Sequence, residues 1–295
     1  MFELLGIPPQ ALFGQLLLGL INGSFYALLS LGLAVIFGML NVINFAHGAL
    51  YMVGAFVAWY LLQYAGIGYW GALIITPVVV GILGLVIEKT MLRHLYKLDH
   101  LYGLLLTFGL ALILEGGFKY QYGVSGQSYP VPAALNGGTN LGFMFLPFYR
   151  GWVVALSIVV CVATWYAIEK TRLGSYLRAA TENPKLVQAF GINVPVMITM
   201  TYGTGVALAG LAGVMAAPIY SVNPLMGSNL IIVVFAVVVI GGMGSIFGAV
   251  ASGYLLGLME GLTKVFLPEA SNIVVFLIMV VVLLLRPAGL FGRER

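Results

Sequence analysis

Residues 11–38 read ALFGQLLLGLINGSFYALLSLGLAVIFG, a mostly apolar run without a single charged side chain. About 20 apolar residues are enough for one helix to cross the hydrocarbon core of a bilayer. The rest of the chain has the same character, because 61% of its 295 residues are hydrophobic and 7% are charged, whereas soluble proteins carry about 25% charged residues. Lipid must therefore cover most of the surface. This composition excludes a soluble enzyme, a nucleic-acid-binding protein, a disulfide scaffold and a disordered chain.

Eight further apolar segments follow the first, so the sequence predicts an all-α polytopic membrane protein whose residues 1–295 form a single transmembrane domain. Bends around 38–48 and 241–246 leave the expected number of transmembrane helices between eight and ten. The nine segments are 11–38, 47–64, 69–88, 101–119, 151–168, 196–217, 228–242, 246–266 and 271–286.

The basic residues predict the orientation of these segments. Most of the 13 Lys and Arg side chains lie in the loop 89–100, in the loop 169–195 or after residue 285. Cytoplasmic loops carry an excess of Lys and Arg, so we expect all three regions in the cytoplasm. The N-terminus and the loop 120–150 would then lie outside. The residues concerned are Lys89, Arg93, Lys97, Lys170, Arg172, Arg178, Lys185, Arg286, Arg293 and Arg295.

Polar side chains interrupt the apolar pattern in NVINFAHG, residues 41–48. Asn41, Asn44 and His47 would be costly in contact with lipid, so they should face protein or a water-filled path. One interpretation is a break between two helices beside a transport route. The other is an interfacial turn, in which Asn and Gly perform their ordinary role.

The loop 169–195 contains a second distinctive stretch. Asn183 can cap a helix, Pro184 suits its first turn, and Gly191 suits the left-handed position after its end. The short helix between them places Leu186, Val187 and Phe190 on an apolar face. A helix of about two turns is marginal alone in water. Its apolar face should pack either on the helix ends of this chain or in a groove on another cytoplasmic protein.

Two Glu–Lys pairs with i,i+4 spacing, Glu115–Lys119 and Glu260–Lys264, are expected near the outer side. They either neutralise each other or line the mouth of a pathway. Cys161 is the only cysteine, and neither a metal-binding pattern nor a GxxxxGK[ST] phosphate loop occurs. The sequence therefore predicts no cofactor, metal site or catalytic group in this chain.

Four stretches together resemble the branched-chain amino-acid permeases of ABC transporters. They are NVINFAHGALYMVG at 41–54, RAATENPKLVQAFGIN at 178–193, GGMGSIFGAVASG at 241–253 and RPAGLFG at 286–292. The resemblance implies the shorter permease subunit of an importer in a bacterial inner membrane. Its partners would be a second permease, two cytoplasmic ATPase subunits that bind ATP, and an extracytoplasmic substrate-binding protein.

The resemblance also implies that the loop 169–195 is the region that couples the permease to its ATPases. Asn41, Asn44 and His47 are the candidate translocation residues, and the candidate coupling residues are Arg178, Glu182, Leu186, Val187, Phe190 and Gly191. Similar permeases carry urea, short amides or aromatic acids, so these cargoes are alternatives. An ion-coupled secondary transporter is a further alternative. It is disfavoured because such proteins usually keep ionisable groups deep in the membrane, where this sequence is nearly free of charge.

Overall fold

A computed structural model describes residues 8–40 and 42–292 of the chain. Asn41, Arg293 and Arg295 therefore lie outside the described residues. Each of the nine apolar segments predicted from the sequence forms a helix, and seven of these helices are long and apolar enough to cross a membrane. Helices α9 and α11 are the two shorter ones. The nine are α1 (Pro9–Leu40), α2 (Ala46–Ala65), α3 (Tyr69–Thr90), α4 (His100–Tyr122), α5 (Phe148–Glu169), α8 (Val194–Ala216), α9 (Ser228–Gly241), α10 (Ile246–Phe266) and α11 (Val274–Leu285).

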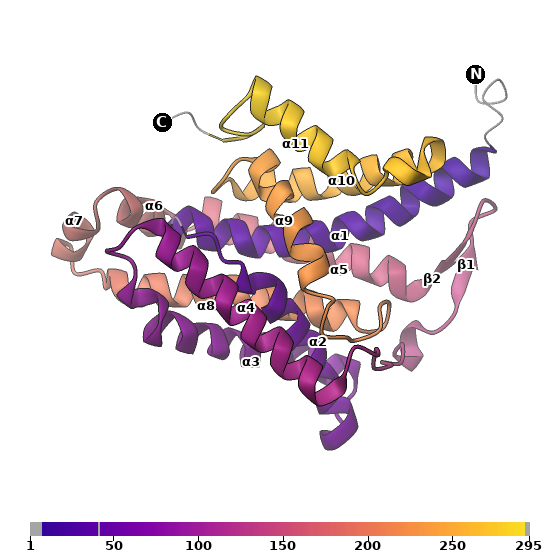
Figure 1. The fold of residues 1–295 in the computed structure, drawn as a ribbon, viewed down its shortest axis with the longest axis horizontal. Helices are drawn as coiled ribbons and strands as arrows, with labels where there is room; N and C mark the ends of the chain where they lie inside the picture. The colour runs from indigo at the N-terminus through magenta and orange to yellow at the C-terminus, as the bar shows by residue number, and fades with distance from the viewer. Residues whose placement is uncertain (1–7, 41, 293–295) are drawn as a thin grey trace.

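The remaining elements lie at the two ends of the helical bundle (Figure 1). One end carries α6 (Arg172–Glu182) and α7 (Pro184–Ala189), together with the α3–α4 connection and the C-terminal segment. The opposite end carries the antiparallel hairpin of β1 (Gly138–Asn140) and β2 (Phe145–Pro147), in which Thr139 pairs with Leu146. We call these the α6–α7 end and the hairpin end. The described residues also include three single-turn 3₁₀ helices: η2 (Leu92–His94), η3 (Ala133–Leu135) and η4 (Pro268–Ala270).

Helix α1 runs through the middle of the bundle and packs against α10 through glycine. A Cβ atom at Gly19 would lie 2.4 Å from the carbonyl oxygen of Gly257, and a Cβ atom at Gly257 would lie 2.5 Å from Cα of Gly23. One turn further on, a Cβ atom at Gly261 would lie 2.4 Å from the carbonyl oxygen of Gln15. In lipid, helices gain little from hydrophobic burial and associate by close backbone packing. Glycine at these positions therefore allows the backbones of α1 and α10 to come into contact.

Helix α8 repeats this arrangement on another side of α1. A Cβ atom at Gly205 would lie 2.9 Å from the carbonyl oxygen of Gly32, and a Cβ atom at Gly54 of α2 would lie 2.5 Å from the carbonyl oxygen of Gly210. The outward face of α4 instead exposes large apolar side chains such as Ile113. The buried part of the bundle is thus built from α1, α2, α8 and α10, while α4 faces lipid or a partner.

The loop 123–147 packs on the bundle. The backbone groups of Gln127 and Val222 exchange two hydrogen bonds of 2.8 and 2.9 Å, which join this loop to the segment after α8. Tyr129 in the same loop is buried, and burial raises the pKa of its phenol to about 12. The phenol is therefore neutral at physiological pH.

The two predicted Glu–Lys pairs differ. Glu260 and Lys264 form an ion pair in α10, and Glu260 is largely buried. For Glu115 and Lys119 the expected mutual neutralisation was wrong, because no ion pair joins them in the described structure. Their alternative place at the mouth of a pathway stays a prediction. Both lie on the poorly covered α4, and an exposed pair gains little from holding two long side chains in one geometry.

The glycine contact between α1 and α10 can be tested with a matched pair of variants. Gly257→Ala places a methyl group against the backbone of Gly23, and overpacking of this kind costs about 1–3 kcal/mol. Gly116→Ala on α4 is the control, since a Cβ atom there meets nothing within 4 Å. We expect Gly257→Ala to lower the melting temperature of the purified chain in detergent and Gly116→Ala to leave it unchanged or raise it. Equal melting temperatures for the two variants would contradict this account of the packing.

Candidate functional site

The segment 42–45 forms a buried break between α1 and α2. Asn44 is fully buried, and its amide nitrogen donates a hydrogen bond of 3.1 Å to the hydroxyl of Tyr202 on α8. The hydroxyl of Thr107 on α4 accepts from the backbone N–H of Phe45 and donates to the carbonyl of Ile43, each at 3.2 Å. Irregular backbone at membrane depth is tolerated only where protein or water satisfies its polar groups. Here α4 and α8 satisfy them, so residues 42–45 separate two helices and their polar groups face protein. The position of this break beside a transport route stays a prediction.

His47 lies in the first turn of α2 and is also fully buried. Its Nε2 lies 3.1 Å from the carbonyl oxygen of Leu29, and a Cβ atom at Gly32 would lie 2.9 Å from its ring. The Nδ1 atom of His47 and the Oδ1 atom of Asn44 have no hydrogen-bond partner among the described residues. The structure thus brings Asn44 and His47 together inside the subunit, against α1 and α8. Their role in translocation stays a prediction.

The chain between α5 and α8 contains the predicted short helix and one that the sequence did not reveal. The Asn183 side chain accepts a hydrogen bond of 3.0 Å from the N–H of Leu186, Pro184 occupies the first turn of α7, and Gly191 has φ of 81°. The start and stop signals of α7 are therefore confirmed. Helix α6 was missed. Its buried residues Gly174, Leu177 and Ala180 recur every three positions, which is a helical signal.

The three residues predicted to form the apolar face of α7 do not share one environment. Val187 is buried against Ala180 of α6 and Val194 of α8, so the expectation that it faces a partner was wrong. Leu186 and Phe190 remain 54% and 77% exposed. Val187 projects between α6 and α8 and so holds α7 against the bundle. Leu186 and Phe190 project away from the chain. Glu182 and Gly191 are also exposed.

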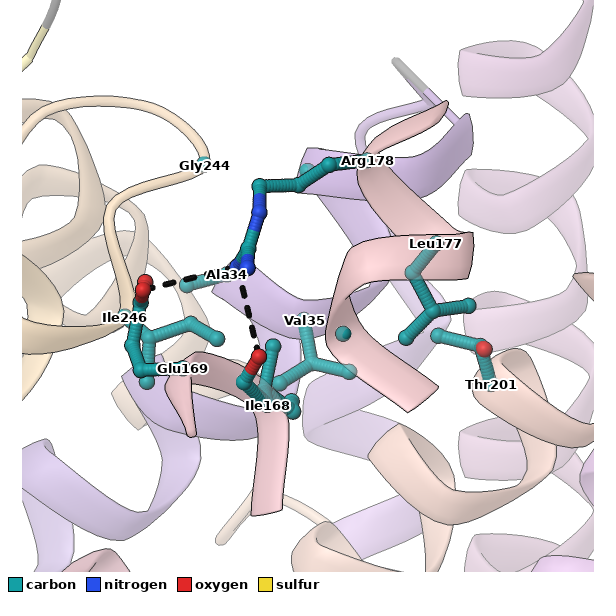
Figure 2. A pocket seen from close by; sticks show the side chains of 11 residues that line it. Ala34, Val35, Ile168, Glu169, Leu177, Arg178, Thr201, Gly244 and Ile246 are labelled. Atoms are coloured by element: carbon teal, nitrogen blue, oxygen red, sulfur yellow. Dashed lines mark hydrogen bonds and ion pairs between the residues drawn. The ribbon is translucent and has the colours of Figure 1, made fainter. Parts of the chain in front are cut away.

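Arg178 turns inward at the α6–α7 end (Figure 2). Its guanidinium donates to the carbonyl oxygen of Ile168, the last-turn residue of α5, at 3.2 Å, and lies 3.4 Å from the carboxylate of Glu169. The Arg178 side chain remains 48% exposed beside these internal contacts, so its expected contact with a partner's polar groups stays a prediction. A cation at the end of α5 is favoured because the carbonyl groups there lack helical partners and carry partial negative charge.

A small cavity of about 80 Å³ lies beneath Arg178, where α1, α5, α6, α8 and the α9–α10 connection meet (Figure 2). A Cβ atom at Gly174 would lie 1.5 Å from the carbonyl oxygen of Ile168, so α6 touches the end of α5 without an intervening side chain. The cavity is too small for a solute much larger than a few waters. Because residues of α6 line the cavity together with all these elements, a displacement of α6 would change the contacts among them.

Glu88 near the end of α3 is a buried carboxylate that sequence reasoning missed. It accepts hydrogen bonds from the hydroxyls of Thr199 on α8 at 2.6 Å and of Tyr96 at 2.8 Å. Burial, and then the neighbouring carboxylate, raise the pKa of Tyr96 above its usual value, so this phenol remains a donor. The three side chains join α3, α8 and the α3–α4 connection. The only sequence signal was an acidic residue at the end of an apolar run.

A larger, polar cavity of about 250 Å³ opens toward the hairpin end between α1, α2 and the start of α9. Sequence reasoning missed it because its residues are dispersed from 22 to 230 and carry no charge. The uncharged amides within apolar runs were the available signal. The lining residues are Asn22, Phe25, Tyr26, Tyr51, Tyr220, Asn223, Met226, Asn229 and Leu230.

Comparison with known proteins identifies the family of this chain. Residues 15–283 match the family model described as branched-chain amino acid transport system / permease component. The chain belongs to this permease family. It is a multi-pass membrane protein and the membrane-spanning component of an ABC transporter. No solved structure matches the chain.

The relatives of this permease include subunits of two lengths. It is 30% identical to the high-affinity branched-chain amino acid transport system permease protein LivH of Escherichia coli K12 and 32% identical to BraD of Pseudomonas aeruginosa, with 95% of each chain covered. It is also 28% identical to the permease protein LivM of Escherichia coli K12, over 92% of this chain and 68% of LivM. The full-length match to LivH and BraD agrees with the prediction of the shorter type of permease subunit.

The contact between Asn44 and Tyr202 of the permease can be measured by a double-mutant cycle. Tyr202→Phe removes the acceptor of the Asn44 amide, Asn44→Leu removes the donor, and the double variant removes both. Leaving a buried group without its partner costs about 1–3 kcal/mol, so each single variant should lower the free energy of unfolding. The double variant should cost less than the sum of the singles. Additive effects would show that the two side chains do not interact.

Proposed function

We propose that this chain is one of two permease subunits of an ATP-driven importer for branched-chain amino acids in a bacterial inner membrane. The observation that carries the proposal is the similarity, over 95% of both chains, to the branched-chain amino acid permeases LivH and BraD. The weaker similarity to LivM supports a second, related permease as partner. ATP would be bound by two cytoplasmic ATPase subunits, and cargo would be delivered by an extracytoplasmic binding protein.

In this proposal the α6–α7 end faces the cytoplasm and the hairpin end faces outward. The basic residues of the α3–α4 connection and of α6–α7 support this orientation, since cytoplasmic loops are enriched in Lys and Arg. Exposed Leu186 and Phe190 would enter a groove on an ATPase subunit, with Glu182 and Gly191 exposed beside them. A helical element that docks its apolar side chains in a groove is a common recognition mode.

The contacts of α6 supply a path for the resulting motion. Val187 attaches α7 to α6 and α8, while Gly174 and Arg178 join α6 to the end of α5. A push on α7 would therefore reach α5 and α8. It would also reach α1 and the α9–α10 connection, because residues of both line the cavity beneath Arg178 together with α6. Arg178 would act as a link within the permease. Leu186 and Phe190 would make the contact with the ATPase.

The energy source is tested with the assembled complex in proteoliposomes that contain ATP. We expect leucine uptake only when the binding protein, both permeases and active ATPase subunits are present. Uptake should persist after ionophores collapse the ion gradients, because ATP hydrolysis drives it. Uptake that continues with a hydrolysis-deficient ATPase and stops with ionophores would instead support an ion-coupled transporter. Transport of urea, short amides or aromatic acids in place of leucine would change the cargo while keeping the mechanism.

The ATPase contact is tested by four alanine variants of the permease, at Phe190, Leu186, Phe266 and Val187. Loss of a buried aromatic anchor typically costs about 2 kcal/mol or more at an interface, so Phe190→Ala should weaken ATPase association about 30-fold. Phe266→Ala, at an exposed Phe of the hairpin end, is the control and should leave association unchanged. Val187→Ala should instead lower the melting temperature of the permease itself, because Val187 is buried within the chain.

These effects are measured by titrating purified ATPase subunits onto the permease in nanodiscs. Wild-type association and coupled transport by both Phe190→Ala and Leu186→Ala would exclude α7 as the contact.

A further inference from the structure

The polar cavity at the hairpin end has a composition that suits a small, uncharged or zwitterionic solute. Six of its nine lining residues are Asn or Tyr, and none is Asp, Glu, Lys or Arg. Its volume of about 250 Å³ is near the lower limit of ligand pockets, which span roughly 300–1,000 Å³. Asn229 is exposed and Tyr220 is 40% exposed, so the cavity opens at the surface of the subunit. It is therefore accessible and of the size of a single amino acid.

Tyr51 supplies an unused hydrogen-bonding group in this cavity. The residue is 1% exposed, and its hydroxyl makes no hydrogen bond to another described residue, although it lines the cavity. The hydroxyl oxygen is not sealed inside the protein but is open to the cavity, where it can donate to a bound molecule. Tyr51 lies four residues after His47, on the same side of α2. A ligand in the cavity would supply the missing partner for its hydroxyl.

The N-terminus of α9 provides a second polar feature of the same cavity. No side chain caps α9 at Gly227, and a Cβ atom at Gly227 would lie 2.1 Å from the carbonyl oxygen of Gly48 on α2. Met226, Asn229 and Leu230, on either side of this terminus, line the cavity. The N-terminus of a helix carries partial positive charge that favours a carboxylate. Here the N–H groups of Asn229 and Leu230 already donate to the carbonyl oxygens of Leu225 and Gly227, at 3.1 and 3.2 Å, so the attraction is that of the helix dipole. This terminus is thus fixed against α2 beside Tyr51.

The remaining polar groups of the wall are either neutral or neutralised. The hydroxyl of Tyr220 donates to Oδ1 of Asn22 at 3.2 Å. The hydroxyl of Tyr26 donates to Glu260 at 2.7 Å, and Glu260 in turn is paired with Lys264. No net charge at the wall therefore selects for a cation or an anion.

We propose that this cavity is the first cargo site of the permease and that it binds a zwitterionic α-amino acid with an apolar side chain. The carboxylate is placed at the N-terminus of α9 and the Tyr51 hydroxyl. The ammonium group is placed at the amide oxygens of the wall, and the side chain against Phe25, Met226 and Leu230. The cargo class rests on the proposed function, whereas the location rests on the cavity itself.

The test is protection of an introduced cysteine by substrate. In a Cys161→Ser background, Asn229→Cys places a thiol in the cavity, and Ser228→Cys places one beside it on the exposed start of α9. Labelling by a maleimide is followed in the assembled transporter without binding protein. Leucine at ten times its dissociation constant should slow labelling at 229 by about tenfold and leave labelling at 228 unchanged. Isovalerate, which lacks the ammonium and one methylene of leucine, and isoamylamine, which lacks the carboxylate, should not protect.

Two further variants test the hydrogen bond from Tyr51. Tyr51→Phe, added to the Asn229→Cys chain, should raise the leucine concentration needed for half-protection by about fivefold. Tyr60→Phe, a phenol on α2 that does not line the cavity, should not change it. If Asn229→Cys fails to assemble, Asn22→Cys takes its place.

The outcomes separate this inference from the proposed function. Suppose that the wild-type complex imports leucine with ATP, but leucine does not protect the thiol of the Asn229→Cys or Asn22→Cys variant. This result would overturn the cavity as cargo site and leave the importer intact. Equal protection at 228 and 229, or equal protection by isovalerate, would also overturn it. Protection at 229 in a complex without ATP-driven uptake would support the cavity and contradict the importer.

Discussion

The close approach of backbones around α1 is the constraint on which the rest of the structure depends. In lipid, apolar side chains gain nothing by exchanging lipid contacts for protein contacts, so helices associate where their backbones can approach closely. Gly19 and Gly257 meet on the α10 side of α1, and Gly32 and Gly205 meet on the α8 side. These contacts enclose α1 and fix the positions of α8 and α10 beside it.

The second constraint is that polar backbone groups inside the membrane need partners. The break at 42–45 is possible because Thr107 bonds the backbone of Ile43 and Phe45, and the Tyr202 hydroxyl accepts from the Asn44 side chain. Such interruptions occur in transporters where irregular backbone lines a cavity or is buried in protein. The start of α9 is a comparable interruption, and it lies against the first turn of α2. The polar cavity is located where these two helix starts approach each other, so the unusual backbone lies beside the proposed cargo site.

The two ends of the subunit have different designs that suit their proposed tasks. At the hairpin end, neutral amides and phenols form an open cavity. At the α6–α7 end, Gly174 and Arg178 join α6 tightly to α5, and Leu186 and Phe190 extend away from the chain. To transmit force from a partner, the subunit needs an exposed apolar contact, here Leu186 and Phe190, and a close connection from that contact to the membrane helices, here α6 against α5. Uncharged walls at one end and a firm attachment at the other allow one bundle to hold cargo and to be driven.

The sequence by itself determined the nine apolar helices and the ends of α7, because these depend on local properties. Hydrophobic length defines a helix in lipid, and Asn183, Pro184 and Gly191 act within one turn of their own position. Only the tertiary structure decided that Val187 faces inward while Phe190 faces outward, since that depends on Ala180 and Val194. It also decided that Arg178 binds the end of α5, and that residues as distant as Asn22 and Asn229 share one cavity. These features arise from neighbours far apart in the chain, whose proximity no local pattern encodes.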